Sequence, residues 1–149
     1  MSGDILVTIS IDLDYDSPYR LYYSNKPIAI SKGLLAGPGL DNILKLFKFF
    51  SIKSTFFIPG WIAEKYENMV LNIYSQGHEI AAHGYMHEHL DKLPYEDEYK
   101  IHSRSINILK DLIGVKPKGF RAPYWEVSEN TFKIIAELGF EYDSSLRSD

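Results

Sequence analysis

Two short apolar runs, STFFI at residues 54–58 and EIAA at residues 79–82, flank an amphipathic stretch from Trp61 to Gln76. The first run is rich in β-branched and aromatic residues and stops at Pro59-Gly60, and Gly77 follows the amphipathic stretch. These patterns predict a strand, a helix that ends at the glycine, and a second strand. A strand–helix–strand unit of this length is typical of a parallel sheet.

The same alternation continues on both sides of this unit. Apolar runs predict strands at 5–11, 118–121 and 140–142, and helices are expected to begin at Asp41, at Pro94 and at Ser128. The pattern predicts an α/β protein whose parallel sheet is either open or curled into a barrel. Residues 14–40 lack clear periodicity and are expected to form a long functional connection. We expect a single domain over residues 1–149.

Composition excludes several classes of function. The 149 residues carry a net charge of −4 and contain no run of like charges, so neither nucleic acid nor an anionic membrane is an expected partner. The absence of cysteine excludes disulfides and thiolate ligands, so any metal would be bound by His, Asp or Glu. The N-terminus does not resemble a signal peptide and no segment could span a bilayer, which predicts a cytoplasmic location.

Polar side chains follow several of the predicted strands. Asp12 and Asp14 come after the first strand, His83 and His87 after the third, and Arg121 closes the fourth. The carboxyl ends of parallel strands meet at one edge of a sheet, where active sites of α/β proteins lie. The sequence therefore predicts that these five residues, together with Asp143 after the last strand, share one site.

The two carboxylates and two imidazoles have the spacing of metal ligands. Asp12 and Asp14 alternate with Leu13 and so lie on one side of an extended segment, whereas His83 and His87 would share one face of a helical turn. One carboxylate and two histidines would leave coordination positions open for water, as catalytic metals require. The alternatives are two turn-forming aspartates and two unrelated surface histidines, with His89 the nearest false ligand or outer group.

A guanidinium and a rigid aromatic loop follow the fourth predicted strand. Arg121 is expected to pair with one of the carboxylates and keep it ionised. Pro123, Tyr124 and Trp125, with Tyr85, are candidate substrate contacts that offer flat surfaces to a sugar or ring, although the aromatic residues could equally pack in the core. Dinucleotide-binding and serine-hydrolase motifs are absent.

Three segments together resemble the polysaccharide deacetylase (NodB homology) family: 11–14, 77–87 and 121–125. The resemblance implies a distorted (β/α) barrel that hydrolyses amide bonds, usually the N-acetyl groups of glycans, with a divalent metal bound by one aspartate and two histidines. It implies that Asp12 is the general base, oriented by Arg121, and that Asp14, His83 and His87 are the metal ligands. Zn²⁺ is the expected ion, with Co²⁺, Ni²⁺ or Mn²⁺ also compatible with these donors.

Two departures refine the resemblance. Leu13 separates two aspartates that are usually adjacent in the family. The resulting Asp-x-Asp motif and residues 31–37 are more similar to the branch that contains peptidoglycan deacetylases and allantoinase-like or cyclic-imide hydrolases. The sequence stops at Asp149, before the family's later motif with a leucine-lined pocket and a histidine acid. A C-terminally shortened barrel is therefore expected, with exposed sheet edges that favour a homo-oligomer.

Three functions remain open at this point. The leading one is metal-dependent hydrolysis of non-peptide C–N bonds in an N-acetylated glycan, with Asp12 as base. The second is an allantoinase-like or cyclic-imide hydrolase that acts on a small cyclic amide. The third is a non-catalytic remnant of the barrel that only binds metal or carbohydrate.

Overall fold

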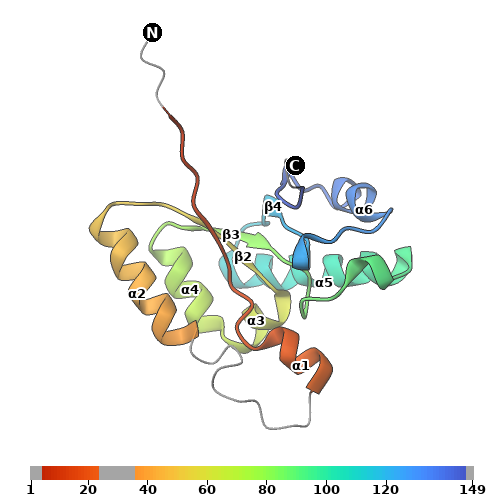
Figure 1. Ribbon diagram of the computed structural model, residues 1–149, viewed down its shortest axis with the longest axis horizontal. Coiled ribbons are helices and arrows are strands. Elements are labelled where there is room, and N and C mark those ends of the chain that lie inside the picture. Colours follow the sequence, from red (N-terminus) through yellow and green to blue (C-terminus); the bar gives the residue numbers. More distant parts are fainter. Residues whose placement is uncertain (1–4, 24–35, 147–149) are drawn as a thin grey trace.

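The computed structural model describes residues 5–23 and 36–146 (Figure 1). Five strands form one parallel sheet in the order β1-β2-β3-β4-β5, which confirms the predicted α/β class. The elements in chain order are β1 (Ser10–Asp12), α1 (Ser17–Tyr23), α2 (Ala36–Phe49), β2 (Thr55–Ile58), α3 (Gly60–Lys65), α4 (Glu67–Ser75), β3 (Glu79–Ala82), η1 (Leu90–Lys92), α5 (Tyr95–Ile113), β4 (Gly119–Phe120), η2 (Pro123–Trp125), α6 (Thr131–Glu137) and β5 (Tyr142–Asp143).

The sheet is open rather than closed into a barrel. Within the described residues, β1 is one edge of the sheet and β5 is the other. The core lies between the central strands and the helices packed on them, where Phe56, Ile58, Ile73, Leu109 and Phe120 are fully buried. Burial of such side chains contributes about 1.5–3 kcal/mol each relative to exposure, so the central strands are firmly held.

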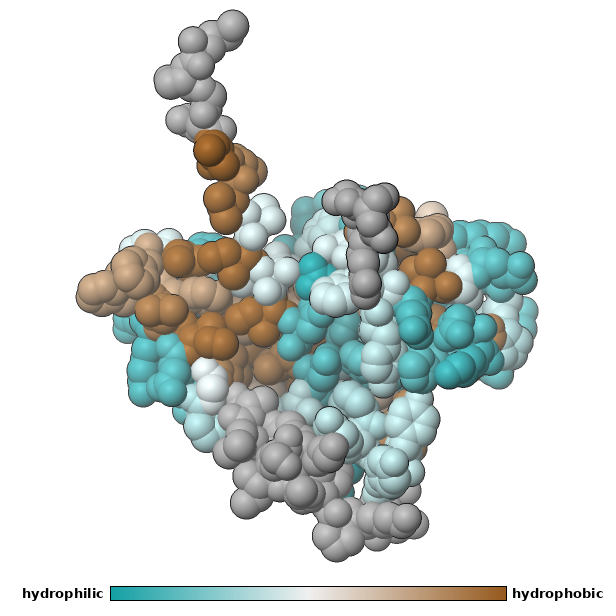
Figure 2. All heavy atoms as spheres, viewed as in Figure 1, coloured by the Kyte–Doolittle hydropathy of each residue, from teal (hydrophilic) through white to brown (hydrophobic). Residues whose placement is uncertain are grey.

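The first predicted strand is much shorter than expected. Only Ser10–Asp12 pair with β2, and the apolar residues before them project away from the body (Figures 1 and 2). Ile5 is 89% exposed and Leu6 is 90% exposed. The β-branched run predicted a buried strand, but burial needs a second layer or a neighbouring strand, and the described residues supply neither beside residues 5–7.

Other boundaries differ for local reasons. The helix expected from Trp61 to Gln76 is two helices, because Tyr66 leaves the helical conformation between α3 and α4. The stretch 14–40, expected as a connection, contains α1 and the start of α2. Residues 31–35 of the segment used for the family resemblance lie outside the described residues.

Helix ends were predicted more accurately. α5 begins directly after Pro94 and ends at Gly114, whose φ of +77° is the left-handed conformation that glycine adopts easily. The expected cap of the last helix is displaced: α6 begins at Thr131 with Asn130 at the N-cap position. Oγ of Ser128 instead accepts hydrogen bonds from the amides of Asn130 (2.9 Å) and Thr131 (3.1 Å) in the turn that leads into the helix. None of the helices in the described part of the chain is long and apolar enough to cross a membrane.

Candidate metal centre

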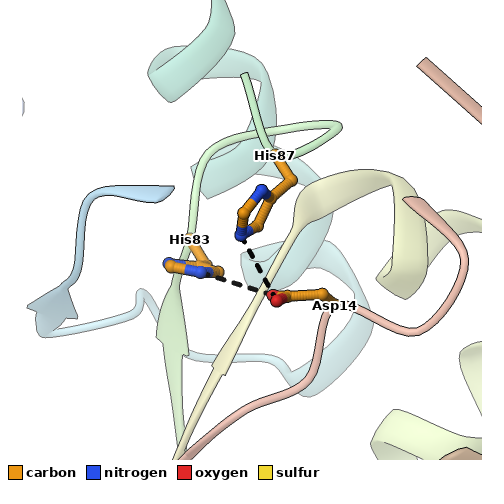
Figure 3. Close-up of side chains that lie close together, drawn as sticks. All are labelled: Asp14, His83 and His87. Atoms are coloured by element: carbon orange, nitrogen blue, oxygen red, sulfur yellow. Dashed lines mark ion pairs between the residues drawn. The ribbon is translucent and has the colours of Figure 1, made fainter. Parts of the chain in front are cut away.

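Three potential ligands converge at the carboxyl ends of the strands (Figure 3). Asp14 follows β1, and its Oδ1 lies 3.3 Å from Nε2 of His83, while its Oδ2 lies 3.3 Å from Nε2 of His87. His83 comes directly after β3 and is 1% exposed, and His87 is 5% exposed. The structure therefore brings together the three residues that the sequence predicted to be close.

The two histidines do not share a helical turn, which corrects the expectation from their spacing. Residues 83–87 form a tight loop, in which Gly84 has φ of +68° and His87 has φ of +67°. The carboxylate of Glu88 accepts hydrogen bonds from the amides of Tyr85 (3.0 Å) and Met86 (2.7 Å). This buried carboxylate stabilises the loop and so helps to direct His87 towards Asp14.

One hydrogen bond determines which nitrogen of the His83 ring carries the proton. Nδ1 of His83 lies 2.7 Å from the carbonyl oxygen of Arg121, and a carbonyl can only accept, so Nδ1 carries the proton. In the neutral ring this leaves the Nε2 lone pair directed at Asp14. Metal-binding histidines are commonly oriented in this way.

The donor set fits a divalent ion. Oδ1 of Asp14 and Nε2 of His83 are buried without hydrogen-bond partners, which is costly unless something else occupies their lone pairs. Two imidazoles and one carboxylate suit Zn²⁺ and its first-row neighbours. Burial raises the pKa of Asp14, and positive charge on the His83 and His87 side lowers it below its usual range, so a cation held between these side chains would keep Asp14 ionised.

Asp14 is held in place from its C-terminal side. Its carbonyl oxygen accepts hydrogen bonds from the amide (3.0 Å) and the hydroxyl (2.8 Å) of Ser17, at the start of α1. Asp16 is fully buried and accepts hydrogen bonds from Arg20 (2.9 Å) and from the Tyr66 hydroxyl (3.1 Å). α1 is thereby fixed against the connection between α3 and α4.

Asp12 lies beside the three candidate ligands but pairs with a different residue. Its Oδ1 lies 2.5 Å from Nη1 of Arg121. The guanidinium also donates to the Ser10 hydroxyl (3.0 Å) and to Ser144, and it lies over the ring of Phe57 at 4.0 Å. The Arg121 side chain is thus fixed by contacts with β1, with β2 and with the residue after β5, and it holds Asp12 in one orientation.

The sixth candidate of the shared edge, Asp143, has a structural role. Its carboxylate accepts hydrogen bonds from the amide (2.9 Å) and hydroxyl (2.6 Å) of Ser145, whose hydroxyl oxygen accepts one from the Ala122 amide (2.8 Å). Asp143 therefore ties the end of β5 to the loop after Arg121. It is not among the converging ligands.

A cleft of about 610 Å³ opens above the predicted ligands. Asp12, Asp14, His83 and His87 line its polar floor. Its walls are aromatic or apolar and consist of Tyr15, Pro18, Tyr19, Tyr22, Tyr23, Tyr124 and Trp125.

The tyrosines around α1 were missed in the sequence. The only available signal was their density, four tyrosines within residues 15–23, with three of them spaced to share a face once that segment is helical. Two predicted substrate contacts lie elsewhere. The Tyr85 hydroxyl donates to Glu64 (2.6 Å), and Pro123 is buried; neither lines the cleft.

Unusual backbone conformations gather at this cleft. Five non-glycine residues in the described part of the chain have positive φ, and four of them belong to the site: Tyr15, His87, Tyr124 and Trp125. Such conformations cost about 1–3 kcal/mol each and persist where the surrounding structure imposes them. The strain is therefore concentrated in the residues that form the floor and walls of the cleft.

His89 is an outer neighbour of the site, as the sequence suggested. Its ring stacks on the ring of Tyr124 with centroids 4.2 Å apart. The rings of Tyr124 and His87 meet edge to face, with centroids 4.3 Å apart. Nδ1 of His89 lies 2.9 Å from the carboxylate of Glu126. The three rings form a column that supports the aromatic wall beside His87.

Comparison with known proteins identifies the family. The polysaccharide deacetylase family model matches residues 35–142. The chain belongs to the polysaccharide deacetylase family. A curated peptidoglycan deacetylase from Helicobacter pylori is 37% identical over 149 residues, which cover 98% of this chain and 51% of that protein. The chain thus spans about half the length of this relative.

Solved structures agree with the family assignment. A chain from Mycobacterium smegmatis superposes with a TM-score of 0.85 at 37% identity and covers 93% of this chain and 50% of that one. Puue allantoinase superposes with a TM-score of 0.80 at 24% identity, covering 95% of this chain and 54% of that one, and this likeness shows the fold alone. The five-stranded sheet of this member of the polysaccharide deacetylase family therefore matches about half of the longer chain from Mycobacterium smegmatis.

Proposed function

We propose that this protein is a metal-dependent hydrolase that removes N-acetyl groups from a glycan such as peptidoglycan. The observation that carries the proposal is the meeting of two separate units in one cleft: the Asp14–His83–His87 cluster and the Asp12–Arg121 pair. The first unit has the donors of a catalytic metal site, and the second offers a fixed carboxylate. The curated relative named above is a peptidoglycan deacetylase.

Asp14, His83 and His87 would hold the ion, most favourably Zn²⁺, with Co²⁺, Ni²⁺ or Mn²⁺ as alternatives. When bound, a divalent ion supplies Lewis acidity that activates water and polarises the amide carbonyl. The hydrogen bond from Nδ1 of His83 to the Arg121 carbonyl keeps Nε2 unprotonated for this purpose.

Asp12 would act as the general base. Arg121 occupies its Oδ1, which leaves Oδ2 to accept the proton of the attacking water. Because Asp12 lines the cleft together with the ligand cluster, its carboxylate is on the side from which a substrate enters. The aromatic side chains that line the cleft would bind the faces of sugar rings, which combine apolar C–H surfaces with polar edges.

The test is release of acetate from N-acetylglucosamine oligomers and from peptidoglycan by the Zn²⁺-supplied chain and its Asp12→Asn variant. We expect turnover by the parent chain, and a loss of about 10²–10⁴-fold in the variant with metal content unchanged. Turnover of a cyclic amide in place of the glycans would assign the small-molecule alternative. Saturable glycan binding with no turnover would assign the binding-module alternative. A cytoplasmic location and self-association remain predictions from the sequence.

A further inference from the structure

A second cavity, of about 750 Å³, lies at the opposite end of the sheet. It opens between α2 and α4, which run side by side in Figure 1, and it reaches the segments that lead into the amino ends of β2 and β3. The cleft proposed for catalysis lies at the carboxyl ends of the same strands. No residue lines both cavities.

A buried histidine forms the inner wall of this cavity. His78 is 4% exposed and packs against the rings of Phe47 and Phe56, with centroids 5.6 and 5.3 Å away. The Ser54 amide donates a hydrogen bond to Nδ1 of His78 at 3.2 Å, so Nδ1 is an acceptor and the neutral ring carries its proton on Nε2. Within the described part of the chain, this N–H group has no hydrogen bond to a protein acceptor.

The imidazole stays neutral at physiological pH. Burial, assisted by the nearby Lys53 ammonium, lowers the pKa of His78 below its ordinary value. The ring therefore presents a fixed N–H donor at the wall of the cavity. Nε2 of His78 is not among the buried side-chain polar atoms that lack a partner in the described residues, so water can satisfy this donor while the cavity is empty. An acceptor group on a ligand would replace that water.

The rest of the lining has the chemistry of an anion site with an apolar side. Lys53 is held by its hydrogen bond to the Gln76 carbonyl (2.5 Å), and Lys45 and Lys48 project from one face of α2. Asp41 is the only carboxylate among the lining residues, so positive charge predominates. The remaining lining residues are Leu44, Phe47, Ser51, Ile52, Asn72, Gln76 and His78.

We propose that this cavity binds a small organic anion, in which a phosphate or carboxylate group is attached to an apolar or ring-shaped body. The anionic group would accept from Nε2 of His78 and pair with the lysines at the rim. The apolar body would pack against Phe47 and Ile52. This site is independent of the proposed deacetylase chemistry, because it shares no residue with the Asp14–His83–His87 cleft.

Phenyl phosphate, benzoate and inorganic phosphate are the probes, with benzyl alcohol as the neutral control. Binding is followed by amide chemical shifts and by the ring-nitrogen signals of His78 in the ¹⁵N-labelled full chain. We expect saturable shifts confined to residues 41–53 and 72–78 with one or both aromatic anions, weaker shifts with inorganic phosphate, and none with benzyl alcohol. Preference between phenyl phosphate and benzoate identifies the anionic group.

The matched variants are Lys45→Ala/Lys48→Ala and a control pair of exposed lysines outside the cavity, Lys65→Ala/Lys110→Ala. We expect the first pair to weaken binding by about tenfold or more and the control pair to leave it unchanged. His78→Phe should abolish the residual affinity. The proposal is overturned if no probe saturates at millimolar concentration, if both lysine pairs have equal effects, or if benzyl alcohol binds as well as the anions.

Discussion

Arg121 contacts both halves of the candidate site: its backbone carbonyl lies 2.7 Å from Nδ1 of His83, and its Nη1 lies 2.5 Å from Oδ1 of Asp12. One residue directly after β4 therefore orients a proposed metal ligand through its main chain and the proposed base through its side chain. Substitutions of the side chain leave the first contact intact. The two functions can thus be separated by experiment.

Arg121→Lys is expected to retain metal and lose activity. Lysine keeps the charge but cannot contact Asp12, Ser10 and Ser144 simultaneously, as the guanidinium does. Misplacement of Asp12 by about 1 Å is sufficient for a loss of about 10²-fold in kcat. Acetate release and metal per chain, measured on the same preparation, check this. An equal loss of acetate release and of bound metal would show that Arg121 is needed for assembly of the site as a whole.

Metal content tests the ligand assignment directly. We expect about one ion per chain by elemental analysis, and its loss in Asp14→Ala and in the His83→Ala/His87→Ala double variant. Asp111→Ala is the matched control, because Asp111 is an exposed carboxylate on α5 that belongs to neither group of potential metal ligands in the described residues. Full metal content in Asp14→Ala would remove Asp14 from the ligand set.

Glu88→Ala should weaken metal binding although Glu88 is not one of the converging ligands. The carboxylate holds the amides of Tyr85 and Met86, and without it the loop loses the constraint that keeps His87 at φ of +67°. A loss of about 10–100-fold in metal affinity is typical for supporting groups of this kind. Glu88→Gln, which retains one acceptor, should recover part of the affinity. Equal affinities in the parent and the alanine variant would contradict this role.

A buried carboxylate makes stability depend on acid pH. Burial alone would raise the pKa of Glu98, but the adjacent His102 and the hydrogen bonds from the Ser128 and Thr131 hydroxyls outweigh it and lower the pKa below its ordinary value of 4.5. Because the folded-state pKa is the lower one, this stabilisation is fully present above the unfolded value and is lost as pH falls through the folded value.

Glu98→Gln tests this dependence. We expect the variant to be less stable by about 1.5–3 kcal/mol at neutral pH, with the difference shrinking as pH falls below 4.5. Thermal unfolding of both proteins between neutral and acid pH measures it. A difference that stays constant across that range would show that the charge of Glu98 contributes nothing.

Exposed apolar side chains near the β1 edge predict self-association. Ile5 and Leu6 are about nine-tenths exposed, and Phe49 at the end of α2 is 80% exposed. Ile5→Lys/Leu6→Lys should shift sedimentation towards the monomer, whereas Val115→Lys, at a half-exposed position on the α5–β4 connection, should leave it unchanged. A parent chain that sediments as a monomer at all concentrations would contradict the predicted oligomer.

The sequence alone predicted much of the fold and the main elements of the site. Periods of two and 3.6 residues located the strands and helices, Pro94 and Gly114 marked both ends of α5, and the positions after the strands marked Asp12, Asp14, His83, His87 and Arg121. These features are local, because each depends on residues a few positions apart. Parallel pairing then follows from the alternation of elements.

The tertiary structure decided what local patterns cannot encode. Arg121 meets Asp12 across 109 residues of sequence, and Asp14 meets His83 and His87 only because β1 and β3 flank β2 in one parallel sheet. The same packing placed the α1 tyrosines in one cleft with the candidate ligands and left Ile5 and Leu6 uncovered despite their apolar pattern. Burial and side-chain convergence depend on which distant segments become neighbours, and that is a property of the whole packed chain.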